Sequence, residues 1–234
     1  ETDEQIQTDV QLQTDEGVEQ TVIVPLAEDT EDADATAEQP PILVQGAAGR
    51  NPLLGRLEAA IDEANERIAD QVAADYTLEG MGTTVTGAIF DGTQLALAHI
   101  GDSRIYYLPK REEHLKQLSE DDTYVGWLFR NGKINEREAR THPRRNVLQK
   151  ALGGGNQFVD PQVGAVAYEP GDQFLLCTDG LTEGLYNHQL TDILRPPSGS
   201  PALPENSGVA RRLVETAVHN DGRDNTTALV VQVL

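Results

Sequence analysis

Apolar residues recur along the chain at two different spacings, and each spacing predicts a different kind of element. From Leu54 to Val72 they come every three or four residues, the period of an amphipathic helix. Asn51-Pro52 supplies a capping side chain and then a proline suited to the first helical position. We therefore predict a helix over 53–74. From Thr84 onward the apolar and polar positions alternate instead, which is typical of β-strands.

The alternating runs predict a meander of antiparallel strands. Asp91-Gly92 separates two of these runs and is a strong hairpin signal. Further strands are predicted at 105–108, 114–118, 162–168, 172–177 and 226–234, and further helices at 125–129, 135–140, 189–194 and 209–217. Strands and helices come in runs rather than in strict alternation, so the predicted class is α+β with antiparallel sheets. We expect these residues to be buried: Leu57, Ile61, Ile68, Val85, Ile89, Leu97, Leu175 and Val230.

Residues 1–50 differ from the rest of the chain. They carry thirteen acidic side chains against one basic side chain, Arg50, and the stretch 28–41 is acidic and ends in Pro-Pro. Such a composition buries too little apolar surface to offset the entropy of ordering. We expect 1–50 to be a largely disordered acidic loop or tail and 51–234 to be the folded domain. A short strand is possible at 21–26, where Pro25 would confine it to a sheet edge. A plain solvated spacer and an acidic regulatory segment both remain open.

Charge and cysteine content exclude several classes of protein. The formal net charge of −21 argues against nucleic acid or an anionic membrane as the main partner. The single cysteine, Cys177, forbids an internal disulfide and fits a reducing compartment, so we expect a cytoplasmic protein. No apolar run reaches the length of a membrane span. The sequence begins with Glu1 rather than Met, which is typical of a fragment or a processed product.

Three aspartates share one sequence context. Asp102 and Asp179 each follow an apolar run, Asp224 precedes one, and each lies at a turn that contains or adjoins glycine. A single Asp-Gly pair is more often a simple turn. Three carboxylates that converged at one rim of a sheet would repel each other without a counter-charge, so the set predicts a divalent cation. Hard oxygen ligands without a cluster of Cys or His favour Mg²⁺ or Mn²⁺ over Zn²⁺.

Five blocks in order resemble one known family. They are EGMGTTVTGAIFDGTQLALAHIGDSRIYYL, LSEDDTYVGWL, THPRRNVLQKALGG, FLLCTDGLTEGL and GRDNTTALVVQV. From about Leu53 to Leu234 the chain is similar to the metal-dependent protein phosphatase family (PPM, type 2C), in particular its bacterial branch. The resemblance implies a sandwich of two antiparallel β-sheets flanked by helices. It also implies hydrolysis of phosphoserine and phosphothreonine in proteins by a water that two or three Mn²⁺ or Mg²⁺ ions activate.

The resemblance also implies roles for individual residues. Asp179 and Asp224 match the carboxylates that hold one metal of the pair, and Asp102 matches the carboxylate that helps to hold a third ion. Asp121 or Asp122, at the start of the flap beside the active site, could face the substrate or the third metal. No side chain acts as the nucleophile, because water does. We expect His99, His142 and Cys177 to be packing residues, and the Arg144-Arg145 pair to form local contacts more readily than to bind a phosphopeptide.

One family block has no counterpart in the sequence. The family carries an early Arg that grips the phosphate and an Asp-Gly-x-Gly-Gly-His run whose Asp bridges both metals, whereas no Arg precedes Arg50 here. Either the block lies upstream of Glu1, which Glu1 in place of Met favours, or it is lost. In the first case we also expect the opening strands of the first sheet to be missing. We expect the 234-residue chain alone to be inactive and a longer chain that restores the block to be active.

Three functions remain open at this point. The first is a phosphatase that acts on phosphorylated proteins, the substrates of a serine/threonine kinase. The second is a catalytically inactive phosphatase-like module that binds such proteins or a kinase. The third is another metal-dependent phosphoesterase on the same scaffold.

Overall fold

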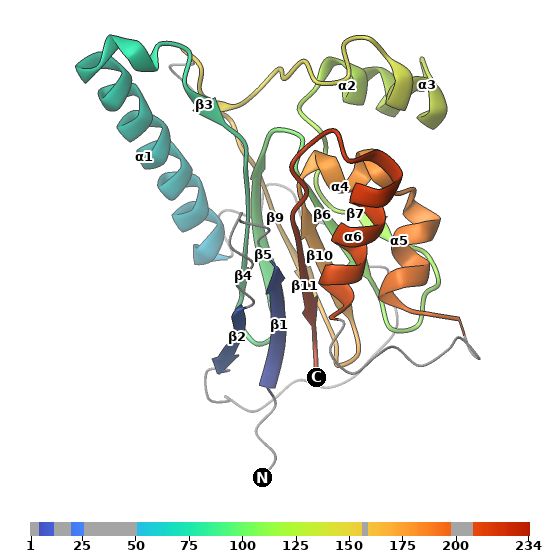
Figure 1. The fold of residues 1–234 in the computed structure, drawn as a ribbon. Helices are drawn as coiled ribbons and strands as arrows, with labels where there is room; N and C mark the ends of the chain where they lie inside the picture. The colour runs from blue at the N-terminus through green and yellow to red at the C-terminus, as the bar shows by residue number, and fades with distance from the viewer. Residues whose placement is uncertain (1–4, 12–19, 26–50, 156–158, 198–207) are drawn as a thin grey trace.

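Two antiparallel sheets pack face to face, and helices cover both outer faces (Figure 1). The computed structural model describes residues 5–11, 20–25, 51–155, 159–197 and 208–234. Every strand pair within this part of the chain is antiparallel. The predicted α+β sandwich is confirmed.

The larger sheet has six strands in the order β2-β1-β11-β10-β6-β7. Their bounds are β2 Gln20–Pro25, β1 Gln5–Gln11, β11 Ala228–Gln232, β10 Gln173–Cys177, β6 Arg104–Leu108 and β7 Lys116–Gln117. At one end of the central strands, Cys177 is paired with Arg104 on one side and with Ala228 on the other. One end of β10 and the starts of β6 and β11 therefore lie next to each other at a single rim of the sheet.

The smaller sheet has three strands in the order β4-β5-β9. Their bounds are β4 Val85–Phe90, β5 Gln94–Ile100 and β9 Gln162–Ala167. The predicted hairpin at Asp91-Gly92 joins β4 to β5, and the Asp91 carboxylate accepts hydrogen bonds from the amides of Thr93 and Gln94. A separate ladder of two residues pairs β3 (Gly82–Thr83) with β8 (Leu152–Gly153).

A core of apolar side chains fills the space between the two sheets. It joins Leu95 and Leu97 of β5 to Tyr107 of β6, Phe174 of β10 and Val231 of β11, all buried. The Phe174 ring stacks on Tyr107 at a centroid distance of 4.8 Å and also contacts the rings of Phe90 and Tyr168 and aliphatic neighbours. Alternation places these residues on the inner face of their strands, as the period of two predicts.

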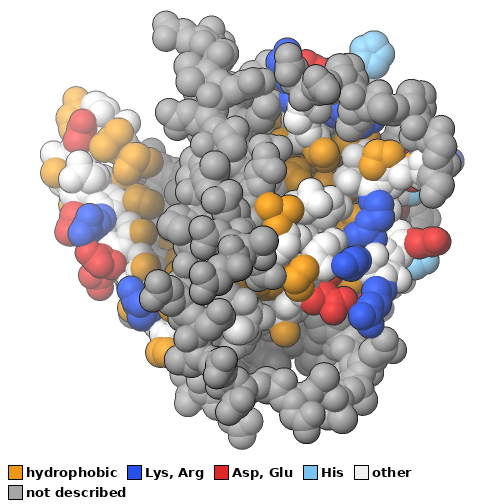
Figure 2. All heavy atoms as spheres, turned by 90° about the horizontal axis from the view of Figure 1, so that it is seen from below, with side chains coloured by type: hydrophobic (Ala, Val, Ile, Leu, Met, Phe, Trp, Pro, Cys, Tyr) orange, Lys and Arg blue, Asp and Glu red, His pale blue; other side chains and the backbone are white. Residues whose placement is uncertain are grey.

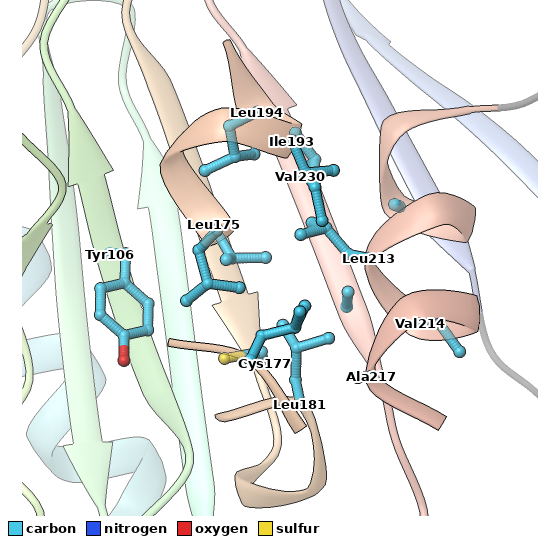
Figure 3. Close-up of a cluster of buried hydrophobic side chains, with 14 of the residues drawn as sticks. Tyr106, Leu175, Cys177, Leu181, Ile193, Leu194, Leu213, Val214, Ala217 and Val230 are labelled. Atoms are coloured by element: carbon cyan, nitrogen blue, oxygen red, sulfur yellow. The ribbon is translucent and has the colours of Figure 1, made fainter. Parts of the chain in front are cut away.

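Three helices cover the outer face of the larger sheet: α4 (Asp179–Gly184), α5 (Asn187–Leu194) and α6 (Val209–Asp221). Figure 3 shows Leu181 of α4 and Leu213 of α6 beside Leu175 of β10 and Val230 of β11. Cys177 lies in the same cluster, buried, so it packs as a small apolar residue as predicted. Burial raises the pKa of its thiol to about 12, which leaves the thiol protonated at neutral pH.

Helix α1 (Pro52–Ala74) covers the outer face of the smaller sheet. The Asn51 side chain accepts a hydrogen bond from the Leu53 amide at 2.9 Å, and Pro52 is the first helical residue, as predicted. Leu54 and Ile61 are buried against β5 and β9. The side of the molecule that α1 occupies also shows acidic and basic side chains in Figure 2, as expected for the solvated face of an amphipathic helix.

The predicted core is correct in part. Ile61, Leu97, Leu175 and Val230 are buried, and Leu57, Ile68 and Val85 are half-buried against α1 or the sheet. The prediction for Ile89 is wrong, because this side chain is 38% exposed. Its strand neighbours Ala88 and Phe90 face the core between the sheets, so Ile89 faces outward. Strand β4 is an edge strand of its sheet, and α1 packs on the outer faces of β5 and β9 rather than over Ile89.

The N-terminal region contributes two strands to the larger sheet. The prediction included a strand at 21–26 at a sheet edge, and β2 lies at the edge of the sheet. Strand β1, which pairs with both β2 and β11, was not predicted, and the sheet gains both strands although its opening strands were expected to be missing. The acidic stretch 28–41 lies outside the described residues. No helix in the described part of the chain is long and apolar enough to span a membrane.

Candidate active site

The rim where β6, β10 and β11 meet brings the three predicted aspartates together. Asp102 lies in the turn before β6, Asp179 is the first residue of α4 just after β10, and Asp224 lies in the turn before β11. The pairing of Cys177 with Arg104 and with Ala228 fixes these three turns side by side. Asp179 and Asp224 follow Asp102 by 77 and 122 positions in the sequence, and strand register alone brings them to the same rim.

The turns of Asp179 and Asp224 touch through Gly180. A Cβ atom on Gly180 would lie 2.5 Å from the Asn225 carbonyl oxygen, so only glycine allows this approach. The Thr178 hydroxyl bridges the same two segments, because it donates to the Asn225 carbonyl and accepts from the Thr227 amide at 3.0 Å. Asp179 therefore starts α4, and Gly180 leaves room for the turn that carries Asp224.

A buried network holds the turn that carries Asp102. Gly101 has φ +112°, and a Cβ atom there would overlap the Thr84 side chain. Its carbonyl oxygen accepts from the Asp122 amide at 2.6 Å and lies 3.0 Å from His99 Nε2, while its amide donates to Asp122 Oδ2 at 3.1 Å. His99 Nδ1 lies 2.9 Å from the Thr86 hydroxyl. His99 is fully buried and lies in the framework of the turn, as predicted for a packed histidine.

Burial and mutual repulsion disfavour charge on these carboxylates. The pKa of Asp102 is raised to about 6, chiefly by burial and then by the charges of Asp179 and Asp121. The pKa of Asp179 is also raised, again by burial first and then by Asp224. The charge of Asp179 therefore interacts with those of both Asp102 and Asp224. A cation between them would remove this repulsion, so the charge of the set suits a divalent ion.

The carboxylate oxygens of the three aspartates suit Mg²⁺ or Mn²⁺, but these side chains are grouped in pairs rather than as a set of three. All three side chains offer hard carboxylate oxygens, the ligands that Mg²⁺ and Mn²⁺ prefer. Within the residues that the structure describes, no three His, Cys, Asp or Glu side chains are grouped so that they could hold one metal ion together. The electrostatic coupling of Asp179 to Asp224 and of Asp102 to Asp179 is instead between pairs.

A cavity of about 370 Å³ opens beside this rim. Asp102 and Asp179 line it, together with residues of a segment that we call the flap. The flap comprises the segment 121–149 with helices α2 (Tyr124–Arg130) and α3 (Glu136–Thr141), which lie beyond the rim in Figure 1. Thr123 caps α2, and a capping box of Asn135 and Glu138 starts α3, close to the predicted bounds.

The two candidate flap residues have different surroundings. Asp121 lines the cavity, and its carboxylate accepts two hydrogen bonds from the Arg104 guanidinium, at 2.9 and 2.6 Å. Gln117 donates to the same carboxylate at 2.9 Å. Asp122 is 8% exposed and bonds to Gly101, so it joins the base of the flap to the Asp102 turn. Arg104 was not singled out in the sequence, although it lies two residues after Asp102.

Arginines fasten the far side of the flap to α4. Arg140 donates to the carbonyl oxygens of Thr182 and Leu185, and its guanidinium lies 3.9 Å from the centre of the Tyr186 ring. Arg145 pairs with Glu183 at 3.0 Å. Arg145 therefore pairs with a carboxylate 38 residues away rather than with a local partner, and both side chains line the cavity. His142, whose ring is tilted by 59° against that of Tyr124, accepts a hydrogen bond from the Arg144 amide and packs as predicted.

Comparison with known proteins identifies the family. The family model described as protein phosphatase 2C matches residues 20–216, so this chain belongs to the protein phosphatase 2C family. It is 40% identical over 182 residues to the serine/threonine protein phosphatase PstP of Mycobacterium tuberculosis, which covers 78% of this chain and 33% of PstP. It is 37% identical over 177 residues to the serine/threonine phosphatase stp of Listeria welshimeri, covering 75% of this chain and 66% of that protein.

A solved structure agrees with this assignment. The catalytic domain of PstP in complex with two manganese ions superposes with a TM-score of 0.66 at 38% identity, covering 78% of this chain and 72% of that one. The chain spans about a third of the length of PstP. The sandwich fold is thus shared with phosphatases of this type, as the sequence predicted.

Proposed function

We propose that the described domain is a metal-dependent protein phosphatase that hydrolyses phosphoserine and phosphothreonine in proteins. The observation that supports the proposal is that Asp102, Asp179 and Asp224 lie in neighbouring turns at one rim, where Cys177 pairs with Arg104 and Ala228, and that Asp102 and Asp179 line the cavity. The relative solved with two manganese ions supports Mn²⁺ or Mg²⁺ as the metal. Phosphorylated proteins, the products of a serine/threonine kinase, are the proposed substrates.

Each carboxylate has a part in this proposal. Asp179 and Asp224 would hold one ion, and Asp102 would help to hold another. When bound, the ions would lower the pKa of a water molecule and neutralise the charge of the phosphoryl group. Asp122 and His99 keep the Asp102 turn in place through Gly101, and the Gly180 contact keeps Asp179 beside Asp224. Flap residues line the cavity, so the flap would help to shield a bound phosphoryl group from bulk water.

A second candidate is a phosphatase-like module that binds phosphoproteins without hydrolysis. One observation favours it: no three metal-binding side chains are grouped in the part of the chain that the structure describes. Binding of a metal by pairs of carboxylates would still attract a phosphate group. It would leave the reaction without the firm positioning on which phosphoryl transfer depends.

Replacement of Asp179 by Asn tests the proposal, because the substitution keeps the shape and removes a ligand charge. We expect Mn²⁺ binding, measured by isothermal titration calorimetry, to weaken about tenfold or more. Hydrolysis of a phosphothreonine peptide that needs Mn²⁺ and is lost in Asp179→Asn would support the enzyme. Asp160→Asn is the control, since that side chain is 93% exposed and lies outside the cavity. Mn²⁺ binding without turnover by a longer chain that restores the missing block would favour the second candidate, and equal Mn²⁺ binding by both variants would contradict the site.

A further inference from the structure

The cavity beside the aspartates has an apolar wall as well as a charged one. Val125 and Phe129 of α2 and Ala139 of α3 line it from the flap. Phe129 is 47% exposed although it lies on a helix with a buried neighbour, Val125. An exposed aromatic ring in a concave site adjoining candidate metal ligands is a typical ligand-contacting position. Trp127 of the same helix is also exposed, at 45%, but lies outside the cavity and stacks on Tyr124.

The charged side chains of the cavity leave no cation for an acidic ligand. Each arginine that lines the cavity is paired with a carboxylate: Arg104 with Asp121, Arg130 with Glu120, Arg140 with Glu136, Arg145 with Glu183 and Arg223 with Asp221. Asp102 and Asp179 line the same space without such a pairing among the ion pairs of the described residues. Bound metal ions would neutralise these two carboxylates, and elsewhere in the cavity the paired arginines and carboxylates carry no net charge.

We infer that the wall formed by Val125, Phe129 and Ala139 selects an apolar side chain next to the phosphorylated residue of a substrate. This inference rests on the proposed function, because it places the phosphate at Asp102 and Asp179. The same cavity contains both the carboxylates and the apolar wall, so one extended peptide could reach both. Acidic flanking residues would find every arginine of the cavity already paired, so an apolar neighbour, which can contact the wall, would be preferred to an acidic one. The substrate class is thus a phosphothreonine or phosphoserine segment with an apolar neighbour.

Substitution at Phe129 tests this inference with a matched control on the same helix. Binding of fluorescent phosphothreonine peptides to the whole chain with Mn²⁺ is followed by anisotropy. One peptide carries leucines and the other carries aspartates beside the phosphothreonine. Phe129→Ser should weaken binding of the leucine peptide about tenfold, because the ring loses its contact with the apolar side chain. Phe129→Leu should restore most of it, and Trp127→Ser should leave it unchanged.

The outcomes separate the inference from the proposed function. The inference would be overturned if Phe129→Ser and Trp127→Ser had equal effects, or if the unsubstituted chain bound both peptides equally. The proposed function would still be supported in that case if phosphopeptide binding depended on Mn²⁺. Binding that needed neither Mn²⁺ nor the phosphate would overturn the proposed function and, with it, the placement of the peptide. Inorganic phosphate has no apolar part to contact the wall, so competition by it should be the same with Phe129→Ser as with the unsubstituted chain.

Discussion

Asp102 is a carboxylate in a place that disfavours its charge. Its pKa is raised to about 6 by burial, then by Asp179 and Asp121. A carboxyl group whose pKa is higher in the folded state contributes stability below its unfolded pKa and loses it as the pH rises through the folded pKa. At neutral pH without metal, the ionised Asp102 therefore opposes folding.

Asp102→Asn should consequently stabilise the metal-free protein at pH 7.5 by about 1–2 kcal/mol, after allowance for solvent screening of a partly exposed group. The difference should shrink as the pH falls from 6 toward 4, because the native carboxyl then binds its proton. Urea unfolding at several pH values measures this. His99, whose pKa is lowered chiefly by burial, has the opposite pH dependence but is present in both proteins and cancels in the difference. The prediction would be contradicted if, without metal at pH 7.5, the unsubstituted protein were more stable than the Asp102→Asn variant.

The three aspartates could be predicted from the sequence because each lies beside a strand at a glycine turn. The roles of Arg104 and Asp122 could not. Their partners, Asp121 and Gly101, lie 17 and 21 residues away, and only the fold brings them together. Phe129 was predicted as one apolar position of a short helix, and its place in the cavity depends on how the flap packs.

Among the elements, the flap and the Asp102 turn are joined at Asp122. This residue exchanges hydrogen bonds with Gly101, and its carbonyl oxygen accepts from the Gln149 amide at 2.7 Å, at the other end of the flap. The isolated bridge between Thr123 and Leu148 closes the same base. The flap therefore begins and ends beside the turn of a candidate metal ligand.

Asp122→Ala should loosen both parts together, because the buried Gly101 amide would lose its acceptor. We expect a loss of about 1–3 kcal/mol in the free energy of unfolding. Amide hydrogen exchange should rise in 101–104 and at the base of the flap, and mass spectrometry of peptides can follow it. Asp160→Ala removes an exposed carboxylate and is the control. Faster exchange confined to the flap, with 101–104 unchanged, would show that the two parts are not coupled.

Helix α4 is an element that local sequence signals did not predict. The sequence predicted a turn at Asp179-Gly180, whereas the chain begins a short helix at Asp179. Leu181 and Leu185 are fully buried against the larger sheet, so packing rather than propensity orders this segment. The long helix α1 was predicted almost to the residue, because its cap and its apolar stripe are both local.

Across the whole molecule, strand order was the part that sequence could not supply. Strand β1 reads QIQTDVQ, with few apolar residues, and its place beside β11 joins segments more than 200 residues apart. The class of fold nevertheless followed from alternation and hairpin signals, because every sheet contact in the described residues is antiparallel.

The sandwich makes a final prediction about its core. Phe174 is 1% exposed between the sheets and meets the rings of Tyr107 and Phe90 at 4.8 and 5.4 Å. Phe174→Ala should lower the free energy of unfolding by about 3–5 kcal/mol, because it removes buried apolar surface and leaves a cavity between the layers. Ile89→Ala, at the exposed face of edge strand β4, should cost less than about 1 kcal/mol. Urea unfolding followed by circular dichroism measures both. Similar losses for the two variants would mean that the sheets do not share the core described between them.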